Sequence, residues 1–470
     1  MFEFLEYVLW ELKNSLALAL LAGVGAMVIL GAVYVFHKRK YAGRKKFPWG
    51  RAVLWLLLAL YLAVVLYATI VRHFGGSRQW NLHLLRAWRE AWNNFSAKNW
   101  ANVLLNVALF IPLGGLLPLL HEKFRKWYRT IPVGLAVSLT IELLQLVFAR
   151  GICDVDDLLA NALGAAIGYF GIMTILALVG EKGKRLRSAI CYGCLTLVPV
   201  AAMGSVFLVY GLREYGNLPD APAYRVDLSG VEWQLDCSLP SQQEIAAVYR
   251  NQSRSTAECD AFAADFAETV GTVFDDISYY QEAAYYMDHG GGDGYHFLFV
   301  NYLDAGYRYS WGNDSEPVWE TADREAVEEA LGKYPLQIPE YAAFTPEGDG
   351  WHSFTVEQSV DGAVMIDGSL RCRYAQDGTV REIENGLLSY RYYGEVDVIS
   401  PEEAWKQVCR GNFSGADALK HSGAETVCVT DCSLDYAIDT KGFYQPVYRF
   451  TLEVSGNGYP YEIMIPAMQA

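Results

Sequence analysis

The chain has 470 residues, more than one ordinary domain requires, and 52% of them are hydrophobic. Its charge is very unevenly distributed. Residues 1–210 hold 22 Lys and Arg against 10 Asp and Glu, a net charge of +12, whereas residues 211–470 hold 16 against 43, a net charge of −27. Binding to nucleic acid needs a basic surface, so the acidic second part excludes that class of partner. The composition predicts a membrane-embedded first part and a water-soluble second part.

Six apolar segments of about 20 residues each predict a polytopic α-helical membrane domain. They cover residues 15–36, 52–71, 101–120, 131–149, 157–179 and 188–210. The first segment follows an acidic stretch, MFEFLEYVLWELK, rather than the basic stretch of a signal peptide, so we expect it to stay in the protein. The membrane domain is therefore predicted at residues 1–210, followed by a linker at 211–223.

The orientation follows from the loops after the first, third and fifth segments. These loops read HKRKYAGRKKFPWGR, HEKFRKWYR and EKGKRLR, and cytoplasmic loops of membrane proteins are rich in Lys and Arg. If every segment crosses the membrane, all three basic loops lie on one side, which is then the cytoplasm. We therefore expect a multi-pass plasma-membrane protein with extracellular N- and C-termini and an extracellular second part.

A polar group of residues is predicted near the outer surface, around the stretch RGICDVDDLLAN at residues 150–161. At 1.5 Å per residue, Glu142 lies about 12 Å deeper than Arg150, and Asn161 lies about 6 Å deeper than Asp157. We expect a ligand-binding pocket open to the outside. Its predicted residues are Asn106, Glu142, Gln145, Arg150, Asp154, Asp156, Asp157 and Asn161.

Glu142 is the most costly of these residues to place, because a carboxylate in hydrocarbon costs several kcal/mol, about 3 on insertion scales. It should face the interior of the helical bundle, where Arg150 is a candidate partner. Glu142 and Asp157 are the candidate catalytic residues if the protein is an enzyme, which the sequence leaves open. The aspartates at positions 154, 156 and 157 are candidate ligands for Mg²⁺, which prefers carboxylates.

A purely structural interpretation stands beside the functional one. Asp154 and Asp157 also fit an N-cap and an acidic first helical turn, and Arg150 fits a helix C-terminus. Asn106 and Asn161 are also typical of hydrogen bonds between membrane helices. Gly164 and Gly168 form a G-x-x-x-G pair, which allows two helices to approach closely.

The segments NVLLNVALFIPLGGLLP and SLTIELLQLVFARGICDVDDLLANALGAAIGY resemble the VanZ-like family. The matching positions are Asn106, Phe110, Pro112, Gly114, Glu142, Gln145, Arg150, Asp154, Asp156, Asp157, Asn161, Gly164 and Gly168. The resemblance covers about residues 50–180. It implies a bacterial plasma membrane and a link to low-level resistance to teicoplanin, a glycopeptide that binds cell-wall precursors outside the cell. It does not imply a particular mechanism.

Residues 224–470 are predicted to form an α+β domain of repeated modules, each a helix packed on an antiparallel sheet. Helices are expected at residues 241–250, 259–274, 322–331 and 400–408, the last with a capping box at Ser400 and Glu403. Asp-Gly pairs at 367–368 and 377–378 predict hairpin turns. The stretches ISPEEAW and QPVYRF resemble the PepSY-like modules of YycH- and YycI-type membrane regulators, which implies binding or regulation.

The second part also holds six cysteines, which an oxidising location would allow to form disulfides. Six cysteines permit 15 pairings, and the sequence does not choose among them. These cysteines are Cys237, Cys259, Cys372, Cys409, Cys428 and Cys432.

Three functions are consistent with the sequence. The first is binding of a cell-surface ligand, either a glycopeptide or a lipid-linked cell-wall precursor, without chemistry. The second is a membrane enzyme that acts on a lipid-linked headgroup. The third is a sensor or regulator whose extracellular domain acts on a membrane regulatory partner. We favour binding, because no nucleophile and base form a recognisable pair.

Overall fold

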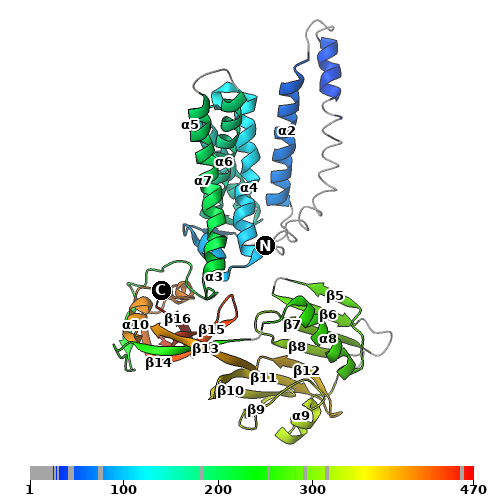
Figure 1. Ribbon diagram of the computed structural model, residues 1–470, viewed down its shortest axis with the longest axis vertical. Helices are drawn as coiled ribbons and strands as arrows, with labels where there is room; N and C mark the ends of the chain where they lie inside the picture. Colours follow the sequence, from blue (N-terminus) through cyan, green and yellow to red (C-terminus); the bar gives the residue numbers. More distant parts are fainter. Residues whose placement is uncertain are drawn as a thin grey trace. The chain divides into compact units, whose positions relative to one another are not determined.

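The computed structural model describes all residues except 1–24, 26, 27, 29, 30, 41–46, 72–77, 180–184, 252, 281, 289–293, 313–316, 456–459 and 470. The chain divides into two compact units, residues 1–213 and residues 214–470. The first is helical, and the second consists mainly of strands (Figure 1).

Five helices of the first unit are long and apolar enough to cross a membrane, within the part of the chain that is described. They coincide with the second to sixth apolar segments predicted from the sequence. The first predicted segment, 15–36, lies largely outside the described residues. The long helices are α2 (Trp49–Leu66), α4 (Ala97–Leu120), α5 (Trp127–Phe148), α6 (Val155–Val179) and α7 (Arg185–Leu212).

Short elements join these helices at their ends. A π-helical turn, η1 (Tyr67–Val71), extends α2, and a 3-10 turn, η2 (Glu122–Phe124), separates α4 from α5. The strands β1 (Gln79–Asn81) and β2 (Ile152–Asp154) pair in parallel, and a short helix, α3 (Arg86–Asn94), follows β1. The predicted pocket residues belong to this end of the bundle, where α4 and α6 begin and α5 ends.

Helices α4 and α6 pack with their backbones in close approach. A Cβ atom added at Gly164 would lie 1.9 Å from the carbonyl oxygen of Val107, and one at Gly168 would lie 2.0 Å from that of Ile111. Both distances are far below contact, so only glycine fits at either position. The predicted G-x-x-x-G pair therefore lies at the α4–α6 interface.

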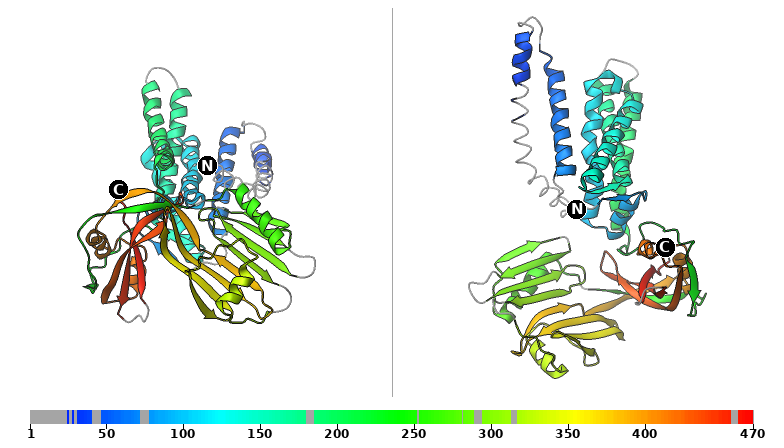
Figure 2. Two further views of the ribbon diagram at one scale, coloured as in Figure 1. Left: turned by 60° about the horizontal axis from the view of Figure 1, so that its bottom comes forward. Right: turned by 180° about the vertical axis from the view of Figure 1, so that it is seen from behind.

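The C-terminal unit is α+β, as predicted. Its strands form one large mixed sheet with the order β3-β14-β15-β4-β13-β11-β12-β8-β7-β6-β5, to which β9, β10 and β16 add. Figure 2 shows these strands, coloured from green through olive to orange, in a curved layer. Their bounds are β3 (Glu232–Leu235), β4 (Glu244–Arg250), β5 (Asp276–Tyr279), β6 (Ala283–Asp288), β7 (Tyr295–Asn301), β8 (Tyr307–Gly312), β9 (Ala343–Gly348), β10 (Trp351–Asp361), β11 (Val364–Tyr374), β12 (Val380–Asn385), β13 (Leu388–Val398), β14 (Thr426–Ile438), β15 (Phe443–Val454) and β16 (Tyr461–Pro466).

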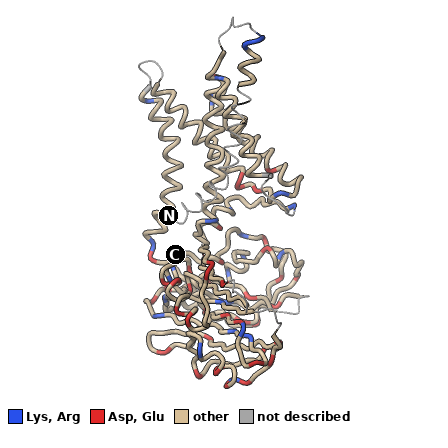
Figure 3. Tube along the Cα trace, turned by 90° about the vertical axis from the view of Figure 1, so that its right-hand side faces the viewer, with Lys and Arg blue, Asp and Glu red and all other residues tan. Residues whose placement is uncertain are grey.

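Four helices accompany the sheet: α8 (Thr256–Val270), α9 (Arg324–Leu331), α10 (Pro401–Cys409) and α11 (Ala416–His421). Two separate cores result, one that includes residues of α8 and α9 and one that includes residues of α10 and α11. The predicted capping box is confirmed, because the Ser400 hydroxyl accepts from Glu403 N–H while the Glu403 carboxylate accepts from Ser400 N–H. Acidic residues, coloured red, are spread along the Cα trace of this unit (Figure 3).

Two local predictions were wrong. Residues 241–250 were expected to be helical, but they contain β4, which lies between β13 and β15 and buries Ala246 and Val248. Pairing on both sides outweighs the weak helical preference of this stretch. The Asp-Gly pair at 367–368 lies inside β11, whereas the pair at 377–378 does form a turn. Gly368 is needed because a Cβ there would lie 2.1 Å from the carbonyl oxygen of Gly386.

Candidate functional site

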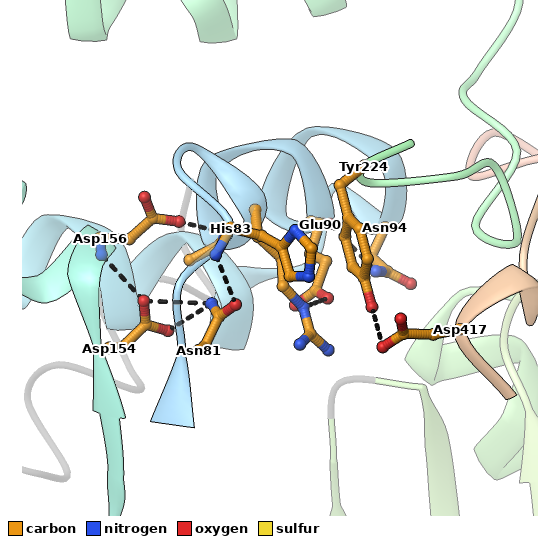
Figure 4. A network of polar contacts seen from close by, with 10 residues as sticks. Asn81, His83, Glu90, Asn94, Asp154, Asp156, Tyr224 and Asp417 are labelled. Atoms are coloured by element: carbon orange, nitrogen blue, oxygen red, sulfur yellow. Dashed lines mark hydrogen bonds and ion pairs between the residues drawn. The ribbon is translucent and has the colours of Figure 1, made fainter. Parts of the chain in front are cut away.

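The aspartate connector between α5 and α6 is held by a second loop, which precedes α3. Strand β1 pairs with β2 so that Asn81 lies opposite Asp154. The Asn81 side-chain amide donates to both carboxylate oxygens of Asp154, each at 3.1 Å (Figure 4). Asn81 is 5% exposed, so this pair is largely shielded from water. Asn81 was not among the pocket residues predicted from the sequence.

Asp156 fixes the start of α3. Its carboxylate accepts from the backbone N–H of Leu85 at 2.5 Å and from that of Ala87 at 2.7 Å. Its own N–H donates to the Asp154 carboxylate at 2.8 Å. The first N–H groups of a helix have no partner within the helix, so Asp156 supplies one from another element. With 1% of its surface exposed, Asp156 has a structural role in holding this loop.

Two of the predicted pocket residues, Asn106 and Asp157, meet across the α4–α6 interface. The Asn106 side-chain amide donates to the Asp157 carboxylate at 2.6 Å. Glu142, which is 2% exposed, accepts from the backbone N–H of Asp154 at 3.0 Å. Glu142 of α5 is thus tied to the connector, whereas Asp157 of α6 is tied to α4.

The remaining predicted residues have other partners. The Gln145 amide donates to the carbonyl of Thr69 in η1 at 3.0 Å, and the Asn161 amide donates to the Ser138 hydroxyl at 2.8 Å. The Arg150 backbone N–H donates to the carbonyl of Gln145 at 2.9 Å, which closes the end of α5. The pairing of Arg150 with Glu142 stays a prediction.

A small cavity of about 70 Å³ lies between α3, α4 and α6, beside Asp156 and Asp157. No Lys, Arg or His is among its lining residues, whereas three carboxylates are. Asn99 and Asn102 are new members of the site, and with Asn106 they recur at helical spacing, a signal that the sequence analysis did not use. The lining residues are Ala87, Trp88, Glu90, Asn99, Asn102, Val103, Asp156, Asp157 and Ala160.

Residues 52–177 match the VanZ/LLP1 family model. The resemblance predicted from the sequence is thus confirmed for this part of the chain, and the protein is a membrane protein with a VanZ/LLP1 domain. No curated protein matches the sequence. Among solved structures, the C-terminal domain of YpeB from Bacillus megaterium matches at 13% identity with a TM-score of 0.19. That match covers 47% of this chain and 100% of the YpeB domain.

The three aspartates of the VanZ/LLP1 domain do not converge on one point. Asp154 accepts from Asn81, Asp156 from the start of α3, and Asp157 from Asn106. Within the described residues, no three His, Cys, Asp or Glu side chains are placed to hold a metal ion. A Mg²⁺ site at these aspartates therefore stays a prediction from the sequence, and we derive no chemistry from it.

A larger groove of about 730 Å³ lies deeper in the VanZ/LLP1 domain, between α2 and the α4–α6 pair. Its lining is almost entirely apolar and includes Tyr61, Pro112 and Gly168. Because it lies along membrane-spanning helices and has no carboxylate, its chemistry is that of the surrounding hydrocarbon. The polar cavity is the better candidate site.

Replacing Asp156 by asparagine should loosen the loop before α3. Asparagine keeps one acceptor oxygen but presents an NH₂ group to the second backbone N–H, which costs about 2 kcal/mol. We expect the Leu85 and Ala87 amides to exchange with deuterium roughly 30-fold faster. The control is Glu90→Gln, which removes the ion pair between Glu90 and Arg86. The side chain of Arg86 is 38% exposed and that of Glu90 is 42% exposed. An exposed ion pair contributes little to stability, so the exchange rates of the Leu85 and Ala87 amides should not change in this control. Equal exchange rates in the two variants would contradict the role of Asp156 in holding the loop.

The stability of the domain should depend on pH through Asp154. Burial raises the pKa of this carboxyl above its usual 3.8, although hydrogen bonds from Asn81 and Asp156 N–H oppose that shift. The folded protein thus holds the proton more tightly than the unfolded chain, and stability falls as pH rises from about 3.8 through the raised pKa. Asp154→Asn should make the fall in thermal midpoint shallower between pH 4 and pH 6. Parallel curves for the two proteins would be inconsistent with this assignment.

Proposed function

We propose that this protein binds a headgroup at the outer surface of a bacterial plasma membrane through the polar cavity of its VanZ/LLP1 domain. The proposed ligand is a lipid-linked cell-wall precursor or a glycopeptide, and this binding would be its link to teicoplanin resistance. The observation that carries the proposal is the cavity itself, in which three carboxylates and two asparagines surround a space of about 70 Å³.

The charge of the connecting loops supports an outward-facing cavity. Helix α4 begins beside the cavity and ends at Leu120, where Lys123, Arg125 and Lys126 follow. The sequences before α2 and after α6, HKRKYAGRKKFPWGR and EKGKRLR, are also basic. Since cytoplasmic loops are the basic ones, the cavity and both termini would lie outside.

The chemistry of the lining favours one part of such a ligand. Carboxylates accept hydrogen bonds and attract positive charge, and the ring of Trp88 can also contact a cation. A phosphate would be repelled by the carboxylates, because none of the described lining residues is a cation and the nearby Arg86 is already paired with Glu90. We therefore propose that the cavity takes an amino group of the ligand and that any phosphate stays outside it.

Binding to the purified full chain in lipid nanodiscs tests the proposal. One arm uses a lipid-linked wall precursor with a free amino group, the second uses the same precursor with that group acetylated, and the third uses teicoplanin. We expect saturable binding of the free-amine precursor or of teicoplanin and at least tenfold weaker binding of the acetylated form. No saturable binding in any arm would overturn the proposal.

A second test concerns the link to resistance. Cells that carry the chain should grow at higher teicoplanin concentrations than cells without it, and a chain with an altered cavity should lose that advantage. A regulatory role would give the opposite pattern. Deletion of residues 224–470 would then change growth in teicoplanin, whereas substitutions in the cavity would not. That outcome would replace binding by regulation as the function.

A further inference from the structure

Cysteines of the C-terminal unit meet where strand β3 runs beside β14. The two strands are parallel, with Trp233 opposite Val427 and Leu235 opposite Val429. The pairing continues one residue further, because the Asp236 N–H donates to the carbonyl of Val429 at 2.8 Å. The side chains of Trp233, Val427 and Val429 belong to the core that α10 and α11 share with the sheet. Cys237, two residues beyond the end of β3, also packs against this core.

A bulge in β14 determines which cysteine lies beside it. The register with β15 shifts between Val429 and Asp431, so β14 holds one extra residue there. Because side chains alternate between the two faces of a strand, an extra residue exchanges the faces. Cys432 therefore faces the same core as Val429, opposite the buried Phe450. Cys428, which lies before the bulge, has the other orientation.

Cys237 and Cys432 both pack against this core, from neighbouring strands. Paired strands lie about 4.8 Å apart, within the range of about 4.4–6.8 Å between Cα atoms that a disulfide requires, and Cys237 directly follows Asp236, whose N–H still donates to Val429 of β14. The pKa values of the thiols also indicate that Cys237 lies close to β14. Burial raises the pKa of Cys432 to about 12, and the nearby Cys237 thiol contributes to that rise. Burial also raises the pKa of Cys237, with contributions from Asp431 and Cys428, so both β14 thiols lie near Cys237 and the orientation of their side chains decides between them. By contrast, burial alone raises the pKa of Cys372.

We infer that Cys237 and Cys432 form a disulfide that links β3 to β14. The inference rests on the outer location of this unit given under the proposed function. Two thiols lose two protons and two electrons as the Sγ–Sγ bond forms. The acceptor is the disulfide of a thiol–disulfide oxidoreductase, whose S–S bond breaks to give two thiols.

The link would stabilise an element that has few other contacts. Strand β3 has four residues, and within the described sheet it pairs with β14 alone. A disulfide between residues 237 and 432 closes a long loop, and long loops give the largest stabilisation. We expect reduction to lower the thermal midpoint of this unit by roughly 5–10 °C.

Mass spectrometry of the full chain tests the pairing. Cells are treated with N-ethylmaleimide before lysis, and the protein is digested with trypsin without reduction. Peptide 226–250 holds Cys237 alone, whereas peptide 421–441 holds both Cys428 and Cys432. We expect these two peptides to be linked, the link to persist in Cys428→Ser, and the link to be lost in Cys432→Ser. A Cys237 found blocked by the reagent in the unaltered protein overturns the inference.

A second arm separates the pairing from the location. The purified protein is fully reduced and then exposed to glutathione disulfide, which serves as the oxidant. If the two peptides link there but not in cells, the native disulfide is overturned and the outer location is the assumption that failed. If they link in neither arm, the pairing itself is wrong, and the proposed binding function is unaffected.

Discussion

Replacing Gly168 by alanine is expected to destabilise the VanZ/LLP1 domain by about 3 kcal/mol. The added Cβ would lie 2.0 Å from the carbonyl oxygen of Ile111 and 2.8 Å from its carbon. The obstacle is backbone and cannot rotate away, so α4 and α6 must separate along their interface. Because Asn106 and Asp157 face one another across that interface, ligand binding should weaken as well.

Gly171→Ala is the matched control, because it lies one turn further along the same helix. A Cβ at Gly171 would meet only the methyl group of Thr196, at 3.8 Å, which is ordinary contact. Alanine is favoured over glycine in a helix by about 1 kcal/mol, so this variant should be unchanged or slightly stabilised. Thermal unfolding in detergent, followed by tryptophan fluorescence, measures both. Equal midpoints for the two variants would refute the close α4–α6 packing.

Asp157→Asn is expected to weaken ligand binding by about 100-fold while the domain stays folded. Asparagine has the same size and keeps an oxygen that can accept from Asn106, so the α4–α6 contact survives. What is lost is a negative charge on the wall of the cavity, and a hydrogen bond to a charged group contributes about 1.5–3 kcal/mol. The affinity for the free-amine precursor should therefore fall towards that of the acetylated precursor.

The control for this variant is Glu122→Gln, which removes an exposed carboxylate in η2, at the far end of α4 from the cavity. It changes the net charge of the chain by the same amount, so it reports any general effect of charge on binding. Titration in nanodiscs should show an unchanged affinity. If both variants bind equally well, the cavity is not the binding site. If Asp157→Asn alone unfolds the domain, Asp157 is structural.

The membrane helices could be predicted from the sequence because hydropathy is a local property. Asn106 and Asp157 were both among the predicted pocket residues, but the hydrogen bond between them was not predicted, because Asn106 was grouped by its depth with Asn161 instead. The partners of Asp154 and Asp156 could not be predicted, because they come from a loop about 70 residues earlier in the chain. Asp156 accepts from backbone N–H groups, which carry no sequence signal, and Asp154 accepts from the Asn81 side chain. Asn81 became recognisable only once β1 was found beside β2.

In the C-terminal unit, the predictions that held depended on neighbours in sequence. The capping box at Ser400 needs only a serine and a glutamate three residues apart. Strand β4 was taken for a helix because its place between two other strands is a property of the whole sheet. The bulge that brings Cys432 onto the face of Cys237 was also invisible, since a single extra residue in β14 is defined only by its register with β15.

The outward orientation of the cavity is the central claim, and thiol labelling of intact cells tests it most directly. Single cysteines are placed at Ile152, an exposed residue of the aspartate connector, and at the C-terminal residue 470, with Glu122→Cys as the cytoplasmic control. The nine native cysteines are replaced by serine in these variants. We predict that a membrane-impermeant maleimide labels the first two positions in intact cells and the third only after permeabilisation. Labelling of Ile152→Cys only after permeabilisation would contradict the account.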